Sequence, residues 1–260
     1  MADFIFARKT RNAASSAVHV LLNLVFAIFS VMITVLTNSP ILGLILVIMS
    51  KWRVFAVRPR YLWTNIKANL LDFIVGASII LLTYFSGTTI LPVDFILAAF
   101  YCAWLIFIKP LTSETANLIQ SLVAVFLGTS TAVIMSSSLD PIVMVVLAFI
   151  IGYSASRHVL AQSNDEDYAL TTLVCGLVFA EVAWLCHSWM IIYTFGNSGI
   201  RIPQLSIILT IFAFIFNRAR QSMLRRDGEL KFRDILAPTI FGVVVIGIIL
   251  IWFSNPIFNI

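Results

Sequence analysis

The stretch Asp72-Phe73-Ile74-Val75-Gly76 begins an apolar run that ends at Tyr84-Phe85-Ser86-Gly87. A second stretch is similar: Glu181-Val182-Ala183-Trp184 leads through another apolar run to Tyr193-Thr194-Phe195-Gly196. Each is a candidate for a membrane-spanning helix, which needs about 20 apolar residues, and each carries one carboxylate. An acid at the centre of such a helix costs about 2.5–3.5 kcal/mol. The two acids therefore predict a repeated helical architecture with a polar interior.

The composition is typical of a membrane protein. Of the 260 residues, 60% are hydrophobic and only 11% are charged, whereas a soluble protein has about 25% charged residues. We therefore expect an all-α, polytopic helical membrane protein that forms a single integral membrane domain over residues 1–260. The first apolar stretch, residues 16–36, is too long for the apolar region of a cleavable signal peptide, so it is expected to remain as a helix.

About nine transmembrane helices are expected from the apolar stretches and their polar boundaries. They are residues 16–36, 40–57, 68–86, 92–108, 117–135, 141–156, 169–195, 203–217 and 235–253. The second stretch is open to two interpretations, because only Ile41 to Met49 is uninterrupted. It is either a spanning helix whose Lys51 and Arg53 side chains reach the headgroups, or a re-entrant segment.

The distribution of Lys and Arg predicts the orientation. With the N-terminus in the cytoplasm, every Lys and Arg except Arg201 falls in a cytoplasmic segment. Because Lys and Arg accumulate in short cytoplasmic loops, we expect the N-terminus inside and, with nine spans, the C-terminus outside. The expected location is the cytoplasmic membrane of a bacterium.

Two groups of four expected spans have the same order of features. Residues 16–108 and 117–217 each contain a helix that turns at a proline, Pro40 or Pro141, into a second helix, and an acid-bearing hairpin follows. Both groups begin on the same side of the membrane. The hypothesis is therefore a parallel repeat of four helices, with residues 235–253 as an extra helix.

Small and polar residues follow one face of two expected helices. In the first span the stripe is His19, Asn23, Ala27, Ser30 and Thr34, and in the fifth it is Asn117, Ser121, Ala124, Gly128 and Thr131. Such stripes either allow close helix packing or line a polar pathway.

The residues proposed for such a pathway, and for proton coupling, share a polar side chain within an apolar span. They are Asp72, Glu181, His19, Asn23 and His187. The alternatives are structural. The two acids could stay neutral and donate hydrogen bonds to a neighbouring helix, and His187 could be a packed or interfacial side chain. Two further acids, Asp94 and Asp140, are expected only to cap helices.

The segment from Lys51 to Lys67 alternates cations with aromatic residues. Such a segment lies in the headgroup layer and gains about 1 kcal/mol per cation from anionic lipid. The expected lipid contacts at the inner face are Lys51, Arg53, Arg58, Arg60 and Lys67. The net charge of +5 comes with no nucleic-acid-binding motif, so we expect no nucleic-acid partner.

The sequence contains none of the common enzyme motifs. There is no HExxH, GxSxG, Walker or CxxC motif, and Cys102, Cys175 and Cys186 lack metal-ligand spacing. We therefore expect no catalytic activity, no metal and no cofactor.

In the segments from Pro40 to Gly76 and, less closely, from Pro141 to Gly176, a short helix that begins at a proline runs into an Arg-containing loop, and a Gly-bearing helix follows. This pattern resembles the membrane domain of the FUSC family, the fusaric acid resistance and aromatic acid exporter proteins. The aromatic residue usual after the proline is replaced here by Ile41 and Ile142, and the chain has no large soluble domain. No functional residue is carried over from the resemblance.

Interior carboxylates favour a small-molecule or ion transporter or permease. The alternative is a non-transporting membrane scaffold or a subunit of an envelope complex, in which a second copy or another membrane protein covers an apolar face. A water-accessible cavity that reaches Asp72 or Glu181 would favour transport. A dry bundle with an exposed apolar face would favour the subunit.

Overall fold

The computed structural model describes residues 2–87, 89–136, 140–161, 167–187, 191–224 and 232–252, with side chains from residue 18 onward except at residues 197 and 252. About 87% of the described residues are helical. The elements are α1 (Ala2–Thr37), α2 (Pro40–Ser50), α3 (Trp52–Phe55), α4 (Pro59–Ser86), α5 (Pro92–Ala103) with a π-helical continuation (Trp104–Ile108), α6 (Glu114–Ser136), α7 (Pro141–Leu160), α8 (Tyr168–Cys186), β1 (Ile192–Thr194), a 3-10 turn (Gly196–Ser198), β2 (Arg201–Pro203), α9 (Gln204–Leu224) and α10 (Phe232–Trp252).

Seven helices in the described part of the chain are long and apolar enough to cross a membrane, namely α1 from Val18 onward, α4 and α6 to α10. This confirms an all-α membrane protein. Two shorter apolar helices, Pro40–Ser50 and Pro92–Ile108, lie where two of the nine spans are expected. The count of nine stays a prediction, because the 11 residues of α2 cover about 16 Å of an apolar core about 30 Å thick.

Local chemistry explains where several helices begin. Pro40, Pro59, Pro92 and Pro141 each occupy the first turn of a helix, where the missing N–H has no intrahelical partner to lose. The cap expected at Asp140 is confirmed, because its carboxylate accepts a hydrogen bond from the backbone N–H of Ile142 at 2.8 Å.

The second expected cap is also present. The Asp94 carboxylate accepts a hydrogen bond from the Leu91 N–H at 2.9 Å and another from the Ser86 hydroxyl at 2.8 Å. It therefore ties the end of α4 to the beginning of α5, in addition to capping α5 as predicted.

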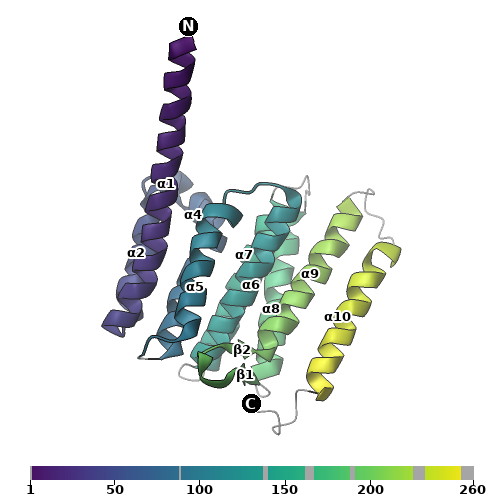
Figure 1. Cartoon of the computed structure of the whole chain (residues 1–260). Helices are drawn as coiled ribbons and strands as arrows, with labels where there is room; N and C mark the ends of the chain where they lie inside the picture. Colours follow the sequence, from purple (N-terminus) through teal and green to yellow (C-terminus); the bar gives the residue numbers. More distant parts are fainter. Residues whose placement is uncertain are drawn as a thin grey trace.

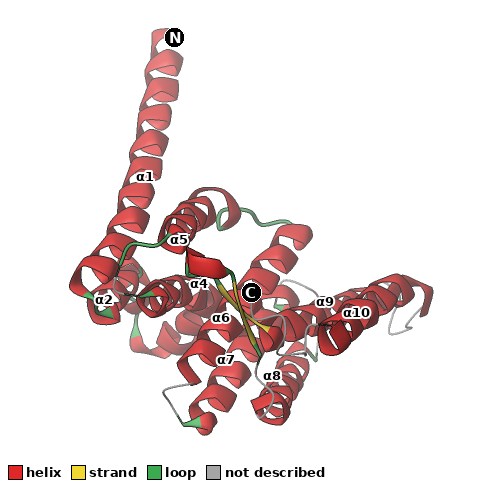
Figure 2. Cartoon of the chain, turned by 60° about the horizontal axis from the view of Figure 1, so that its bottom comes forward, coloured by secondary structure: helices red, strands yellow, loops and turns green. Residues whose placement is uncertain are grey.

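The helices lie side by side, with α6 at the centre of the bundle (Figure 1). Helix α6 packs against α4, α7 and α9, while α1, α2 and α5 surround α4. Helix α8 packs mainly on α7, and α10 packs on α9. The N-terminal part of α1 extends away from the bundle in both views (Figures 1 and 2).

Both polar stripes contribute to helix packing. In α6 the predicted stripe is buried throughout, and its Ser121 hydroxyl donates to the Ala155 carbonyl of α7 at 3.1 Å. In α1 the stripe is buried at Ala27, Ser30 and Thr34. The other two residues of this stripe, His19 and Asn23, are not buried.

The expected helix over residues 169–195 is wrong beyond Cys186. Helix α8 ends at Cys186, and β1 pairs with β2 as an antiparallel hairpin in which Tyr193 lies opposite Ile202. Gly196 and Gly199 have φ of +50° and +77°, a backbone region that glycine enters at little cost. These two glycines allow the tight return of the chain that a continuous helix would exclude.

The hairpin gives the bundle two distinct ends. The end that carries residues 192–203 is named the hairpin end, and it lies at the bottom of Figure 1 and comes forward in Figure 2. The opposite end, where Lys51 and Lys109 lie, is named the ionic end.

Candidate functional site

The predicted interior acid, Asp72 in α4, is the centre of a cluster of polar side chains. One carboxylate oxygen, Oδ1, accepts a hydrogen bond from Trp104 Nε1 at 2.9 Å. The other, Oδ2, pairs with the ammonium of Lys109 at 2.7 Å and with the ammonium of Lys51. The exposed fractions of the side chains are 14% for Asp72 and 8% for Lys51. We name Asp72, Lys51, Lys109 and Trp104 the ionic cluster.

Close packing of α2 on α4 brings Lys51 to the carboxylate. A Cβ added at Gly43 of α2 would lie 2.7 Å from Ile80 Cγ2 of α4, and one at Gly76 of α4 would lie 2.9 Å from Val47 Cγ1 of α2. Only glycine permits this approach, because any other residue would push the helices apart. Lys51 directly follows the last residue of α2, so the contact of α2 with α4 places its side chain near Asp72.

The π-helical segment explains how α5 supplies two partners. The backbone N–H of Lys109 donates to the carbonyl of Trp104, five residues earlier, at 2.8 Å. In a regular α-helix residues five apart point in directions about 140° apart. The wider turn of an i→i+5 bond brings the second residue back toward the face of the first. Trp104 and Lys109 can therefore both reach Asp72.

A glutamine holds the chain just after this segment. Gln120 of α6 donates from Nε2 to the carbonyls of Ile108 and Leu111, at 2.7 and 3.0 Å. Its Oε1 lies 2.7 Å from Nε2 of His158 in α7. Three elements are thereby joined beside the ionic cluster.

The two lysines of the cluster differ in their exposure to solvent. Two ammonium groups share one carboxylate, and Lys109 is 46% exposed whereas Lys51 is buried. Burial lowers the pKa of Lys51 from its ordinary value; the charge of Asp72 opposes this effect, and the charge of Lys109 adds to it. Loss of the carboxylate would therefore leave a buried ammonium without compensation. Among the described residues, no group of His, Cys, Asp and Glu side chains is arranged to hold a metal ion.

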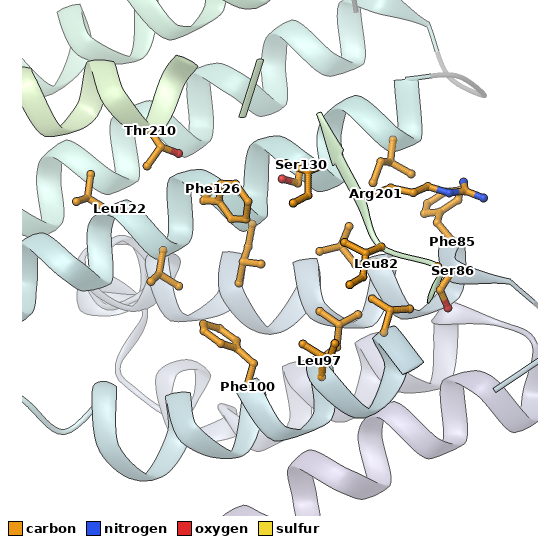
Figure 3. A pocket seen from close by; sticks show the side chains of 18 residues that line it. Leu82, Phe85, Ser86, Leu97, Phe100, Leu122, Phe126, Ser130, Arg201 and Thr210 are labelled. Atoms are coloured by element: carbon orange, nitrogen blue, oxygen red, sulfur yellow. The ribbon is translucent and has the colours of Figure 1, made fainter. Parts of the chain in front are cut away.

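A cavity of about 430 Å³ lies between α4, α5, α6, α9 and the hairpin (Figure 3). We name it the groove. Its walls are almost entirely apolar and include Leu82, Leu97, Phe100, Leu122 and Phe126. Neither Asp72 nor Glu181 lines it.

The groove has different residues at its two ends. Ser86 and Arg201 lie at one end in Figure 3, and Phe100 and Leu122 lie at the other. Phe100 is one helical turn before Trp104, which is 1% exposed and donates to Asp72. Trp104 therefore lies in the helical turn that follows Phe100, the last residue of α5 that lines the groove, and it also contacts Asp72.

The other predicted pathway residues do not join this site. Glu181 is exposed on α8 and lies five residues before the end of that helix, whereas Asp72 lies 14 residues before the end of α4. The expectation that Glu181 faces the interior is therefore wrong. His19 is also exposed on α1, and Asn23 is half-buried.

His187 is half-buried just beyond α8. Its Nδ1 atom is buried, and no described residue gives it a hydrogen bond. It is remote in the fold from the ionic cluster, because α8 reaches the hairpin end there.

The predicted lipid contacts also divide. The prediction that Lys51 contacts lipid is wrong, because its ammonium is buried against Asp72 and does not face the headgroups. Arg53, Arg58 and Arg60 are exposed and Lys67 is half-buried. The Arg60 guanidinium lies 4.5 Å from the Tyr61 ring centre, and the Lys67 ammonium lies 5.1 Å from that of Trp63.

Sequence reasoning missed Trp104, Lys109, Gln120 and His158 as partners at this site. One signal was present: Lys109 directly follows an apolar stretch, and a charge there needs a partner or the headgroup layer. No periodicity indicates the π-helical turn that joins Trp104 and Lys109.

No protein-family model, curated protein or solved structure matches this chain. The resemblance to the FUSC membrane domain therefore stays a prediction.

Proposed function

We propose that the chain is a membrane transporter for a small molecule, in which the groove takes the cargo and the ionic cluster closes the path beyond it. The observation that carries the proposal is the position of Trp104, which is one helical turn from Phe100 in the wall of a 430 Å³ cavity and donates a hydrogen bond to the Asp72 carboxylate. A path that is open at one end and closed by a separable contact at the other is what alternating access requires.

The ionic cluster is suited to act as a gate. Its three charged members come from three separate parts of the fold: Asp72 from α4, Lys51 from the end of α2, and Lys109 from the end of the π-helical segment. The two ammonium groups favour the ionised form of Asp72, so coupling to a proton would require the lysines to separate from the carboxylate before it is protonated. Under the positive-inside rule the ionic end is cytoplasmic and the hairpin end is outside.

The packing order supports the internal repeat, which remains part of the proposal. In the first half α1 packs on α2 and α5, and α4 packs on α2 and α5. In the second half α6 packs on α7 and α9, and α8 packs on α7 and α9. If α1, α2, α4 and α5 correspond to α6, α7, α8 and α9, the two halves share these four contacts and differ in two, α1 with α4 and α7 with α9.

The exposed cations of the α3–α4 region remain candidates for anionic lipid. Arg53, Arg58 and Arg60 are free to reach headgroups, while their aromatic neighbours suit the interface. They would hold the ionic end against the inner membrane surface.

Cysteine accessibility tests the gate without knowledge of the cargo. In a chain whose three native cysteines are replaced by alanine, Leu122→Cys places a thiol at the inner end of the groove. We expect a small, membrane-impermeant thiol reagent to reach it from the hairpin end and not from the ionic end. Adding Asp72→Asn should open the second route. The matched control is Asp140→Asn, the same chemical change at an exposed cap. A thiol whose reactivity from the ionic end is the same with and without Asp72→Asn would refute the gate.

A second candidate, a subunit of a membrane complex, is favoured by Glu181. This carboxylate lies on a face of α8 where Leu177, Val178, Trp184 and Leu185 are all exposed. An acid on a lipid-facing surface is costly unless a partner covers it. If a second copy is that partner, the purified protein should be a dimer or larger in mild detergent, and Glu181→Leu should shift its mass toward the monomer. If the wild type is monomeric at every concentration, self-association does not explain the exposed apolar face of α8 that carries Glu181.

A further inference from the structure

The shape of the groove indicates what it holds. Helix α9 packs on α6, whereas α5 packs on α1 and α4. The groove runs along α6, with residues of α5 and α9 in its walls. From Ile134 to Leu122, both of which line it, α6 rises about 18 Å. One leaflet of a bilayer whose apolar core is about 30 Å thick measures about 15 Å. The groove is therefore about as long as one hydrocarbon chain of one leaflet.

The groove has few polar groups, and its one cationic side chain lies at the end where the headgroup of an amphiphile would be. Arg201, the only Lys or Arg among the lining residues, is exposed beside the end of the groove marked by Ser86 (Figure 3). It belongs to β2 at the hairpin end, where a headgroup would lie. A guanidinium binds phosphate or carboxylate oxygens by paired hydrogen bonds.

Ser130 is an independent observation that points to a ligand. It is 3% exposed, lines the groove, and has no hydrogen-bond partner among the described residues. Its neighbours in α6 satisfy their hydroxyls within the helix: Thr129 donates to the Val125 carbonyl and Thr131 to the Leu127 carbonyl. A buried hydroxyl without a partner is costly. Ser130 lies six residues, or about 9 Å, before the end of α6, below the level of the headgroups.

We propose that the groove binds an anionic glycerophospholipid of the hairpin-end leaflet. One acyl chain lies along Phe126, Leu122 and Phe100, the ester carbonyl of that chain accepts the Ser130 hydroxyl, and the phosphate lies at Arg201. The inference rests on the proposed function only in making this lipid the cargo, because binding can be measured separately from transport. A water-soluble solute is a poor occupant, because the walls offer almost no polar partners.

The test uses phospholipids that carry a photoreactive diazirine in the acyl chain, in nanodiscs that contain the full chain. After illumination, the labelled peptides are identified by mass spectrometry. We expect phosphatidylglycerol to label the groove segment of α6 about fivefold more than phosphatidylcholine, the preference that one cation confers on an anionic headgroup. Leu177 on the exposed face of α8 is the internal control, where the two lipids should label equally.

Three variants separate the contacts. Arg201→Gln should abolish the headgroup preference and leave some labelling, Ser130→Ala should reduce labelling by both lipids, and Ser130→Phe should block the groove. Groove labelling that does not depend on the headgroup, or that survives Ser130→Phe, would overturn the proposal. Equal labelling by a photoreactive fatty acid would overturn the assignment to a phospholipid.

The two proposals can fail separately. Lipid labelling with no effect of Asp72→Asn on the Leu122→Cys thiol would leave a lipid-binding protein without the gate. A working gate with no groove labelling would leave a transporter of some other cargo.

Discussion

Replacing Asp72 with asparagine keeps the shape of the side chain and removes the charge that two ammonium groups share. The side-chain oxygen of the new amide could still accept the Trp104 N–H, so the main loss is electrostatic. Lys51 is 8% exposed, and its ammonium would stay buried without a carboxylate. Lys109 is 46% exposed, so water replaces most of what it loses.

The expected magnitude follows from this inequality. Removing one partner of a buried ion pair costs about 3–5 kcal/mol, because the other charge is left uncompensated. For a chain of this size, even 3 kcal/mol corresponds to about 6–12 °C in Tm. Lys109→Met should cost about 1 kcal/mol or less, since an exposed pair contributes little. The double variant Asp72→Asn with Lys51→Met removes both buried charges and should regain most of the lost stability.

The assay is thermal unfolding of the purified protein in one detergent, followed by the fluorescence of its six tryptophans. Asp140→Asn is the matched control and should leave Tm unchanged, because asparagine caps a helix as well as aspartate does. The reasoning is refuted if Asp72→Asn unfolds at the temperature of the wild type. It also fails if adding Lys51→Met to Asp72→Asn lowers Tm further.

Two further predictions concern packing and orientation. Gly152→Ala should destabilise the fold by about 1–3 kcal/mol, because its Cβ would lie 2.5 Å from Phe179 Cγ of α8. Gly247→Ala, where nothing lies within 4 Å, is the control, and equal losses in Tm would contradict the close contact. Reporter enzymes fused after Arg233 and after Ile260 should indicate opposite sides of the membrane; the same side for both would remove the last span or change the count.

The sequence by itself determined the class of the protein and many local features. Sixty per cent hydrophobic residues exclude a soluble fold, and a proline in the first turn places a helix start whatever surrounds it. The caps at Asp94 and Asp140 are equally local, because each involves an N–H within three residues. The stripe of α6 was also visible, since small and polar residues at helical spacing contrast with their apolar neighbours.

The sequence did not predict where α8 ends or which of its faces points into the bundle. Its residues are apolar on every side, so periodicity cannot say which face packs on α7. The structure buries Thr172, Gly176, Phe179 and Ala183, and this choice leaves Glu181 exposed. Because a return of the chain after Cys186 depends on glycines ten or more residues later, the apolar run alone predicted a longer helix.

Only the tertiary structure decided which residues contact the Asp72 carboxylate. Lys51 lies 21 residues before it in the sequence and Trp104 lies 32 after it, so no local rule relates them. Their meeting requires the glycine contacts between α2 and α4 and a turn of α5 that departs from α-helical spacing. A charge inside a bilayer must find a partner, and the sequence can state that need. Which partner satisfies it depends on how the helices pack.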